Sequence, residues 1–424
     1  MDIKALRGTK DILPPETEIW QFIESKARDL CSLYGYQEIR TPLLEEMRLF
    51  TRSIGASSDI VRKEMYAFRD RKKRLLCLRP EATASVVRAY LEHHLDKHLS
   101  LAKLYYIGAM FRAERPQAGR LRQFHHIGAE AIGSASPYLD AEIILLAINI
   151  IRALGIEGWK LEYNSLGCQK DRAKYKSELK RSLKNKLKSL CSDCRDRYKL
   201  NILRIFDCKN PECRKIIREL PGLDASLCAT CGEHYGFVER TLENSLREVN
   251  ILPSDVLVRS PHLVRGLDYY TGTCFEITHD DLGAQNALGA GGRYDNLLSD
   301  LGGPQKPAVG FALGIERLIA VLDSKKEGLT KQTQPRLFIA AIGPEAKHEA
   351  FRLLCSLRKQ NLPCDIDYTD KSLKGQMRQA DRLKAKFVAI LGEVELKKQT
   401  VILRDMRNQQ QKEIKISQLP EELK

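Results

Sequence analysis

Two strand-like segments joined by a polar loop constrain the fold of this chain most strongly. Residues 104–111 and 123–132 are each long enough for an extended strand, and residues 114–122 between them are rich in charged side chains. Such a pair of segments, separated by a short polar connection, is typical of a β-hairpin. We therefore predict a long antiparallel hairpin in the first half of the chain.

One face of this hairpin is a candidate binding surface. Neighbouring side chains on a strand point to opposite faces, so Phe124, His126, Gly128 and Glu130 are expected to share one. Arg112, on the opposing strand, would stand over the same cleft. For any one of these residues a solvent-facing, salt-bridged hairpin is the simpler interpretation. The combination of an aromatic ring, an imidazole, a carboxylate and a guanidinium favours a site.

The size and composition of the chain predict a multidomain globular protein. At 424 residues it is too long for one ordinary core, so two or three domains are expected. A hydrophobic share of 43% and a charged share of 29% exclude a disordered or membrane protein class. The most apolar run, residues 143–154, contains Asn149 and Arg152 and is predicted to be a buried helix. The first residues lack the apolar stretch of a signal peptide, so a cytoplasmic location is expected.

Changes in composition divide the chain. Residues 1–325 are expected to form the main domain, interrupted by a Lys/Arg-rich helical insertion with cysteines at residues 170–247. Residues 326–335 are polar, lack apolar periodicity, and are interpreted as a linker. Strand-like and helical runs then alternate over residues 336–424, which predicts a small α/β domain.

Charge and cysteine content indicate two kinds of partner. The net charge of +15 would attract a polyanion such as nucleic acid, although a solvated basic surface is the alternative. Twelve cysteines in a cytoplasmic chain argue for packing thiols or metal ligands rather than disulfides. Two C-x-x-C pairs in the insertion have the spacing of a zinc site. The first-choice ligand set for one structural zinc ion, with reduced packing thiols left open, is Cys191, Cys194, Cys228 and Cys231.

Four segments, in order along the chain, resemble motifs of histidyl-tRNA synthetases, which belong to the class II aminoacyl-tRNA synthetases. They are residues 7–11 (RGTKD), 111–115 (FRAER), 263–270 (LVRGLDYY) and 310–317 (GFALGIER). A strand that ends at Pro42 resembles the motif at the dimer interface of that class. The resemblance implies an α+β catalytic domain built on an antiparallel sheet, a helical cysteine-containing insertion and a C-terminal α/β anticodon-binding-like domain. It also implies a homodimer.

The resemblance further implies an ATP site. By it, Arg112 contacts the α-phosphate and the substrate carboxylate, Glu114 binds the adenine amino group, and Phe124 stacks on the adenine ring. Arg317 would contact the γ-phosphate and the other face of adenine. These roles suit the residue types, because a guanidinium presents fixed, paired donors to anionic oxygens.

A histidine site follows from the same resemblance. It implies that Glu81 and Thr83 hold the α-amino group and that Glu130 and Tyr270 contact the two imidazole nitrogens. Tyr269 would line the pocket. His126 stands where the family usually has a glutamine that helps to bind the amino group, so it must be neutral to fulfil that role. Arg265 and Arg112 are the expected catalytic residues, since both place a fixed cation at the reacting phosphate.

The activity implied is ligation of L-histidine to tRNA(His), with ATP and Mg²⁺, through a histidyl adenylate and without membrane attachment. Two rivals belong to other classes. One is a synthetase-like regulatory paralogue that binds histidine without charging tRNA; it would be expected to lose the ATP or tRNA determinants. The other is a zinc-bearing nucleic-acid-binding module, which leaves the hairpin and glycine motifs unexplained.

Overall fold

The computed structural model describes residues 3–55, 58–114, 120–322 and 334–423. It divides the chain into two compact units, Met1–Thr330 and Lys331–Lys424. Most of the expected linker, residues 326–333, lies outside the described residues.

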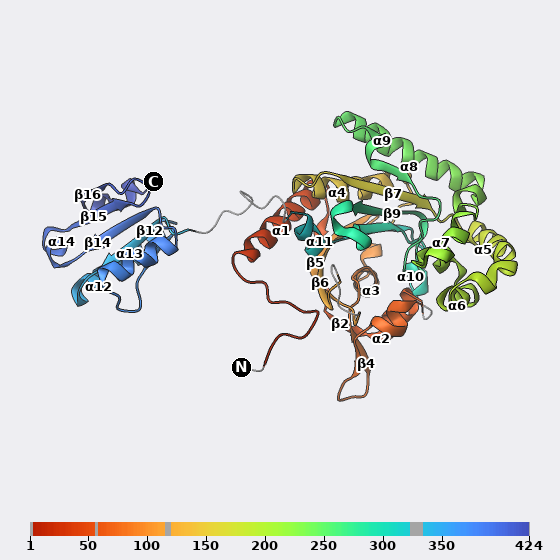
Figure 1. Ribbon diagram of the computed structural model, residues 1–424, viewed down its shortest axis with the longest axis horizontal. Coiled ribbons are helices and arrows are strands. Elements are labelled where there is room, and N and C mark those ends of the chain that lie inside the picture. The colour runs from red at the N-terminus through yellow and green to blue at the C-terminus, as the bar shows by residue number, and fades with distance from the viewer. Residues whose placement is uncertain (1–2, 56–57, 115–119, 323–333, 424) are drawn as a thin grey trace. The chain divides into compact units, whose positions relative to one another are not determined.

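The first unit is built on an eight-stranded sheet with the predicted hairpin inside it (Figure 1). Neighbouring strands are antiparallel except for the two outermost pairs, which are parallel. The order across the sheet is β1 (Gln37–Glu38), β5 (Ala102–Phe111), β6 (Gln123–Ile132), β11 (Ala308–Gly314), β10 (Ala287–Arg293), β9 (Thr271–His279), β7 (Trp159–Ser165) and β8 (Leu257–Arg259). This confirms the predicted α+β fold on an antiparallel sheet.

Helices cover the sheet because they carry apolar faces. The run predicted as a buried helix forms the C-terminal two-thirds of α4, whose isoleucines are fully or almost fully buried. α4 packs on α1, α8 and β11.

No helix in the described part of the chain has both the length and the apolarity to cross a membrane. The helices of this unit outside the insertion are α1 (Glu16–Leu33), α2 (Met47–Ser53), η1 (Ile60–Glu64), α3 (Thr83–Glu92), η2 (Leu95–Lys97), α4 (Pro137–Ala153), α9 (Pro253–Val256), η6 (Asp280–Gln285), α10 (Leu297–Asp300) and α11 (Ile315–Leu322).

A second, small sheet carries the segment before α3. Its strands pair in the order β2 (Leu44–Glu46), β4 (Leu75–Leu78) and β3 (Ala67–Arg69). The helix expected from residue 81 begins at Thr83, because the carboxylate of Glu81 accepts hydrogen bonds from the backbone N–H groups of Thr83 and Ala84, at 2.5 and 3.0 Å. Glu81 therefore caps the helix from outside it.

The residues expected as a basic insertion, 170–247, are helical as predicted. In Figure 1 the green helices of this segment lie together at one side of the sheet. They are α5 (Gln169–Leu183), η3 (Lys184–Ser189), α6 (Ser192–Leu200), η4 (Ile202–Asp207), α7 (Pro211–Arg218), η5 (Leu223–Ser226) and α8 (Ala229–Glu248).

The second unit is a five-stranded α/β domain, as the alternation of strand and helix patterns predicts. β12, β13 and β14 are parallel, whereas β15 and β16 complete the sheet antiparallel. Its elements are β12 (Leu337–Ala341), α12 (Pro344–Lys359), β13 (Cys364–Ile366), α13 (Leu373–Arg382), β14 (Phe387–Leu391), α14 (Glu393–Lys398), β15 (Thr400–Asp405), β16 (Gln411–Lys415), η8 (Ile416–Gln418) and α15 (Leu419–Glu422).

Candidate active site

A cleft of about 480 Å³ on the large sheet gathers the predicted ATP and histidine residues. They come from the loop after β5, from β6, from the start of α3 and the residues just before it, from the loop before β9 and from the first turn of α11. The predicted residues that line it are Glu81, Thr83, Arg112, Glu114, Phe124, His126, Glu130, Arg265, Tyr269, Tyr270 and Arg317. Phe124, His126 and Glu130 do share one face of β6.

Glu130 is a carboxyl group held in a cage of hydroxyls. It is 1% exposed and accepts hydrogen bonds from Thr83 Oγ1 at 2.6 Å, Tyr294 Oη at 2.5 Å and Tyr106 Oη at 3.4 Å. Burial raises the pKa of Glu130 to about 8, even though these hydrogen bonds favour the charged form. The group can thus exchange a proton near neutral pH while its position stays fixed.

Two glycines make room for this cage. A methyl group on Gly128 would lie 2.3 Å from the Tyr106 ring, and one on Gly310 would lie 1.7 Å from Glu130 Oε2. Both distances are far below van der Waals contact. The glycine at position 128 therefore lets the ring of Tyr106 cross β6, and the one at 310 lets the carboxylate lie against β11.

His126 is neutral in this site. Burial lowers the pKa of His126 to about 3, and the guanidinium groups of Arg112 and Arg317 act in the same direction. Its buried Nδ1 has no hydrogen-bond partner among the described residues. A neutral ring meets the condition set for binding an amino group at this position.

Arg112 and Phe124 form the opposite part of the cleft. The Arg112 guanidinium lies 5.3 Å from the centre of the Phe124 ring, and its Nε donates to the backbone oxygen of Pro80 at 3.1 Å. Glu114 pairs with Arg120 at 2.8 Å. The cation is held through Nε and lies over one face of the Phe124 ring, which leaves its other nitrogen donors for a ligand.

Arg265 and Arg317 are anchored from other elements. Arg265 Nη1 contacts Glu276 Oε1 at 2.9 Å. Burial alone would lower the pKa of Arg265, but the carboxylate of Glu276 more than offsets it, so the pKa is raised and the charge is permanent. Arg317 Nη1 donates to the backbone oxygens of Gln285 and Ala287, at 2.9 and 2.6 Å. The cleft thus joins a carboxyl group among phenols to a set of fixed cations.

Comparison with known proteins identifies the family to which a chain with this cleft belongs. A family model described as histidyl-tRNA synthetase matches residues 8–318. The chain belongs to the histidyl-tRNA synthetase family. A model described as an anticodon binding domain matches residues 336–424 of this synthetase-family chain.

Full-length relatives agree with this membership. The histidine–tRNA ligase of Natranaerobius thermophilus is 45% identical over 422 residues, covering 99% of this chain and 98% of the relative. That of Geobacter sulfurreducens is 46% identical, with the same two shares covered. The structure of apo Staphylococcus aureus histidyl-tRNA synthetase has a TM-score of 0.82 and 34% identity over 99% of both chains.

The regulatory rival is not favoured. A Bacillus halodurans structure described as an ATP phosphoribosyltransferase regulatory subunit/histidyl-tRNA synthetase shares the fold, with a TM-score of 0.67 over 92% of this chain and 99% of that chain. At 22% identity that likeness shows a shared fold alone, whereas the two full-length histidine–tRNA ligases named above are 45% and 46% identical. The large cleft also retains its arginines.

Some residues of the synthetase cleft were missed by the sequence reasoning. Tyr106, Glu276 and Gln285 line it but were not predicted. Tyr106 pairs with Gly128 across the hairpin, so the alternation that selected Phe124 and Glu130 could have found it. Glu276 is the only acidic residue in β9, which is a weaker signal.

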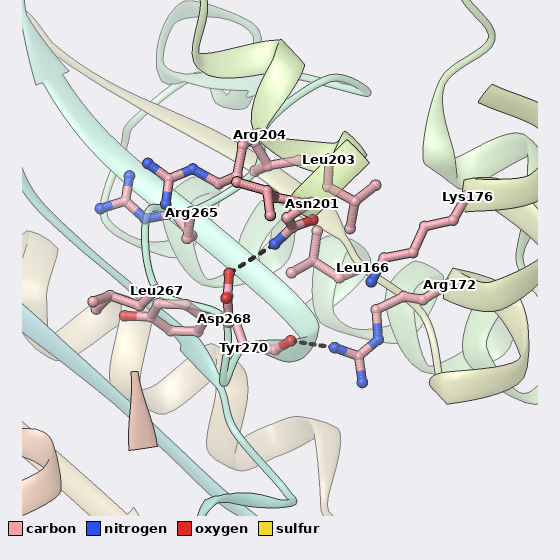
Figure 2. Close-up of a pocket in the computed structure, with 12 residues that line it drawn as sticks. Leu166, Arg172, Lys176, Asn201, Leu203, Arg204, Arg265, Leu267, Asp268 and Tyr270 are labelled. Atoms are coloured by element: carbon pink, nitrogen blue, oxygen red, sulfur yellow. Dashed lines mark hydrogen bonds between the residues drawn. The ribbon is translucent and has the colours of Figure 1, made fainter. Parts of the chain in front are cut away.

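A second pocket, of about 240 Å³, lies where the loop of residues 263–270 meets the insertion, and Figure 2 shows its lining. Asn201 Nδ2 donates to Asp268 Oδ1 at 2.8 Å, and Arg172 Nη1 donates to the backbone oxygen of Tyr270 at 2.9 Å. Arg204 Nη1 donates to the oxygen of Gly266 at 2.8 Å. Insertion residues thus hold the loop that presents Arg265.

Seven of the cysteines form two clusters, and the four residues of the predicted quartet are divided between them. The first cysteine cluster contains Cys191, Cys194, Cys208 and Cys213, and the second contains Cys168, Asp171, Cys228 and Cys231. Each C-x-x-C pair opens a different helix, α6 or α8, so the two pairs are separated by the packing of the insertion. Twelve free cysteines and no disulfide agree with the sequence expectation.

Proposed function

We propose that this chain activates L-histidine with ATP to histidyl adenylate and transfers the histidine to the 3′ end of tRNA(His). The observation that supports this most directly is the single cleft that contains both Glu130 in its hydroxyl cage and the guanidinium groups of Arg112, Arg265 and Arg317. A site of this kind matches a ligand with a polar ring at one end and phosphates at the other.

Histidine would bind with its imidazole at Glu130 and Tyr270. The ring has two polar nitrogens, and a buried carboxyl group and a phenol can pair with both. A side chain without those nitrogens would leave the buried groups unpaired, which costs on the order of 10⁴-fold in selectivity. The α-amino group would contact Glu81, the Thr83 hydroxyl and neutral His126. Thr83 can do this while it donates to Glu130, because a hydroxyl donates and accepts at once.

ATP would lie across the opposite part of the cleft. Phe124 offers its ring face to adenine, and Glu114 accepts from the adenine amino group. Arg112 would bind the α-phosphate and Arg317 the γ-phosphate, and Mg²⁺ bound with ATP would share the neutralisation of the phosphate charge.

In the first step a histidine carboxylate oxygen attacks the α-phosphorus and the bond to pyrophosphate breaks. The protein forms no covalent bond in this scheme. Arg265 and Arg112 stabilise the charge that develops at the α-phosphate, and the rigid cleft supplies proximity. In the second step the tRNA terminal hydroxyl attacks the carbonyl carbon and AMP leaves.

tRNA binding is assigned to the insertion and to the second unit. The insertion is rich in Lys and Arg, and residues 336–424 match an anticodon-binding domain. Phosphate contacts by such cations supply much of the affinity of a protein for a nucleic acid. We infer a cytoplasmic location, where tRNA is charged.

A homodimer is also part of the proposal. Pro42 lies in the segment that resembles the dimer-interface motif of class II enzymes. The next two residues, Leu43 and Leu44, and Phe68 and Leu75 on the other strands of the small sheet are apolar and 42% to 45% exposed. A second copy of the chain would cover them.

Amino-acid-dependent exchange of pyrophosphate into ATP tests the activity. We expect exchange with histidine and none above background with other amino acids. A folded protein that binds histidine but never exchanges pyrophosphate would support the regulatory rival, and equal exchange with several amino acids would contradict the histidine pocket.

A further inference from the structure

The first cysteine cluster has the geometry of a metal site. The sulfur atoms of Cys191, Cys194, Cys208 and Cys213 all lie within 4.8 Å of one another, and those of Cys191 and Cys208 are 3.9 Å apart. Four sulfurs about 2.3 Å from a tetrahedral zinc ion would be about 3.8 Å from each other. A disulfide would need about 2.05 Å. The sulfurs are thus arranged around a common centre rather than in bonded pairs.

Helix ends direct these thiols to that centre. Cys191 is the residue before α6 and Cys194 lies in its first turn, while Cys213 lies in the first turn of α7. Cys208 follows η4 directly. The backbone N–H of Cys191 donates to Cys213 Sγ at 3.2 Å. Helix N-termini and N–H donors stabilise thiolates, the form of cysteine that binds a metal.

Hydrogen bonds already account for the close approach of the residues in the second cluster, without a metal ion. The carboxylate of Asp171 already accepts from the backbone N–H groups of Cys168 and Cys228, at 3.2 and 3.1 Å. These contacts cap α5 and tie its start to the start of α8. Cys228 is also exposed, whereas three of the four thiols in the first cluster are buried.

We propose that Cys191, Cys194, Cys208 and Cys213 bind one zinc ion as four thiolates, and that this ion holds the 263–270 loop in place through η4. The ion would join the start of α6, the end of η4 and the start of α7 into one rigid unit. A tetrathiolate site of this kind is closed and structural, since no coordination position remains for a substrate.

The link to the loop is short. Asn201 and Arg204 lie between Cys194 and Cys208 in the chain, and their side chains donate to Asp268 and to the backbone of Gly266. Phe206 stacks on His262 with ring centres 4.9 Å apart and planes 13° apart. A metal that fixes both ends of this segment would therefore fix the loop that presents Arg265, Tyr269 and Tyr270.

Metal content tests the site independently of the proposed activity. The full-length protein, purified without chelator and desalted after incubation with zinc, is analysed by inductively coupled plasma mass spectrometry. We expect one equivalent of zinc that Cys208→Ser and Cys213→Ser lack and that the matched variants Cys228→Ser and Cys231→Ser retain. A wild-type protein without zinc, or a loss that follows Cys228→Ser instead of Cys208→Ser, would overturn the proposal.

Cobalt provides a second readout that needs no variant. Co²⁺ substituted for zinc in the wild-type protein should give the intense visible bands of a tetrahedral ion with sulfur-to-metal charge transfer from four thiolates. An octahedral spectrum without sulfur charge transfer would overturn the site even if the cysteine variants did not fold.

The effect on the loop rests on the proposed function and is measured separately. Removing zinc from the wild-type protein in saturating Mg²⁺ should lower kcat/KM for histidine in pyrophosphate exchange by about tenfold, the equivalent of one or two loop hydrogen bonds. Asn201→Ala should lower it in the zinc-loaded protein and add little in the zinc-free one. Full additivity of the two losses would show that the ion does not act through η4.

Discussion

Arg265, in the 263–270 loop, forms an ion pair with Glu276, with Arg265 Nη1 2.9 Å from Glu276 Oε1. One residue belongs to the loop and the other to β9, so the pair fixes the guanidinium against the sheet. Arg265 Nε has no hydrogen-bond partner within the described residues. The cation is thus held through Nη1, while its buried Nε is left without a partner in the described part of the chain.

Arg265→His should slow adenylate formation by about a hundredfold, because the loss of one transition-state donor costs on the order of 3 kcal/mol. Histidine binding should change much less, since Glu81, Glu130 and Tyr270 remain. Single-turnover adenylate formation and equilibrium histidine binding measure the two effects. A rate close to wild type, or a loss confined to histidine binding, would contradict the catalytic role.

Glu276→Gln should have a smaller effect of the same kind. The amide keeps the shape of the side chain but loses the charge that holds Arg265, so we expect a loss of about tenfold in the adenylation rate. The same single-turnover measurement checks this. Combined with Arg265→His, the change should add almost nothing, because its effect acts through the arginine.

Glu130→Gln should change how stability depends on pH. Burial raises the pKa of Glu130 from 4.5 to about 8, so the folded protein holds a proton that the unfolded chain has released. The contribution of Glu130 to the free energy of unfolding is therefore present below pH 4.5 and falls by about 1.4 kcal/mol per pH unit until pH reaches the folded pKa.

The glutamine stays neutral, so the variant lacks this slope. Urea unfolding of both proteins, at several pH values between the two pKa values, measures the difference. Both tryptophans, Trp20 and Trp159, lie in the first unit, so their fluorescence follows that unit alone. An equal pH dependence in the two proteins would contradict a raised pKa for Glu130.

His126→Gln should be nearly silent. Burial lowers the pKa of His126 to about 3, so the imidazole is neutral at any working pH and an amide can replace its hydrogen bond. We expect KM for histidine to change by less than about fivefold, the equivalent of ~1 kcal/mol. Steady-state pyrophosphate exchange across the neutral pH range checks this. A KM for histidine that depends on pH in the wild type but not in the variant would show that His126 titrates.

Deleting residues 336–424 should separate the two half-reactions. Every residue of the large cleft lies in the first unit, so pyrophosphate exchange should persist. Charging of tRNA should fall on the order of a hundredfold, because a second binding module supplies effective concentration rather than chemistry. Charging of tRNA at the wild-type rate by the folded, truncated protein would contradict this division of roles.

Local sequence patterns predicted much of the fold and the part of the site that lies on β6. β6 and β12 begin and end where their residue patterns predict, since alternation and turn residues act within a few positions. The same alternation placed Phe124, His126 and Glu130 on one face. The roles of Arg265 and Arg317 came from the family resemblance instead, because nothing in their local sequence shows what they face.

By itself, the sequence determined the elements, the face of the hairpin and the kinds of side chain available to the site. The tertiary structure decided which of them meet. Cys191 and Cys194 join Cys208 and Cys213, not Cys228 and Cys231, because α6 and α8 begin in different parts of the insertion. The raised pKa of Glu130 likewise comes from its burial in the packed cleft, which outweighs the hydrogen bonds from hydroxyl groups such as those of Tyr106 and Tyr294, brought to it by strand register and by the end of β10. Such contacts join residues far apart in the chain, and only the packing of whole elements brings them together.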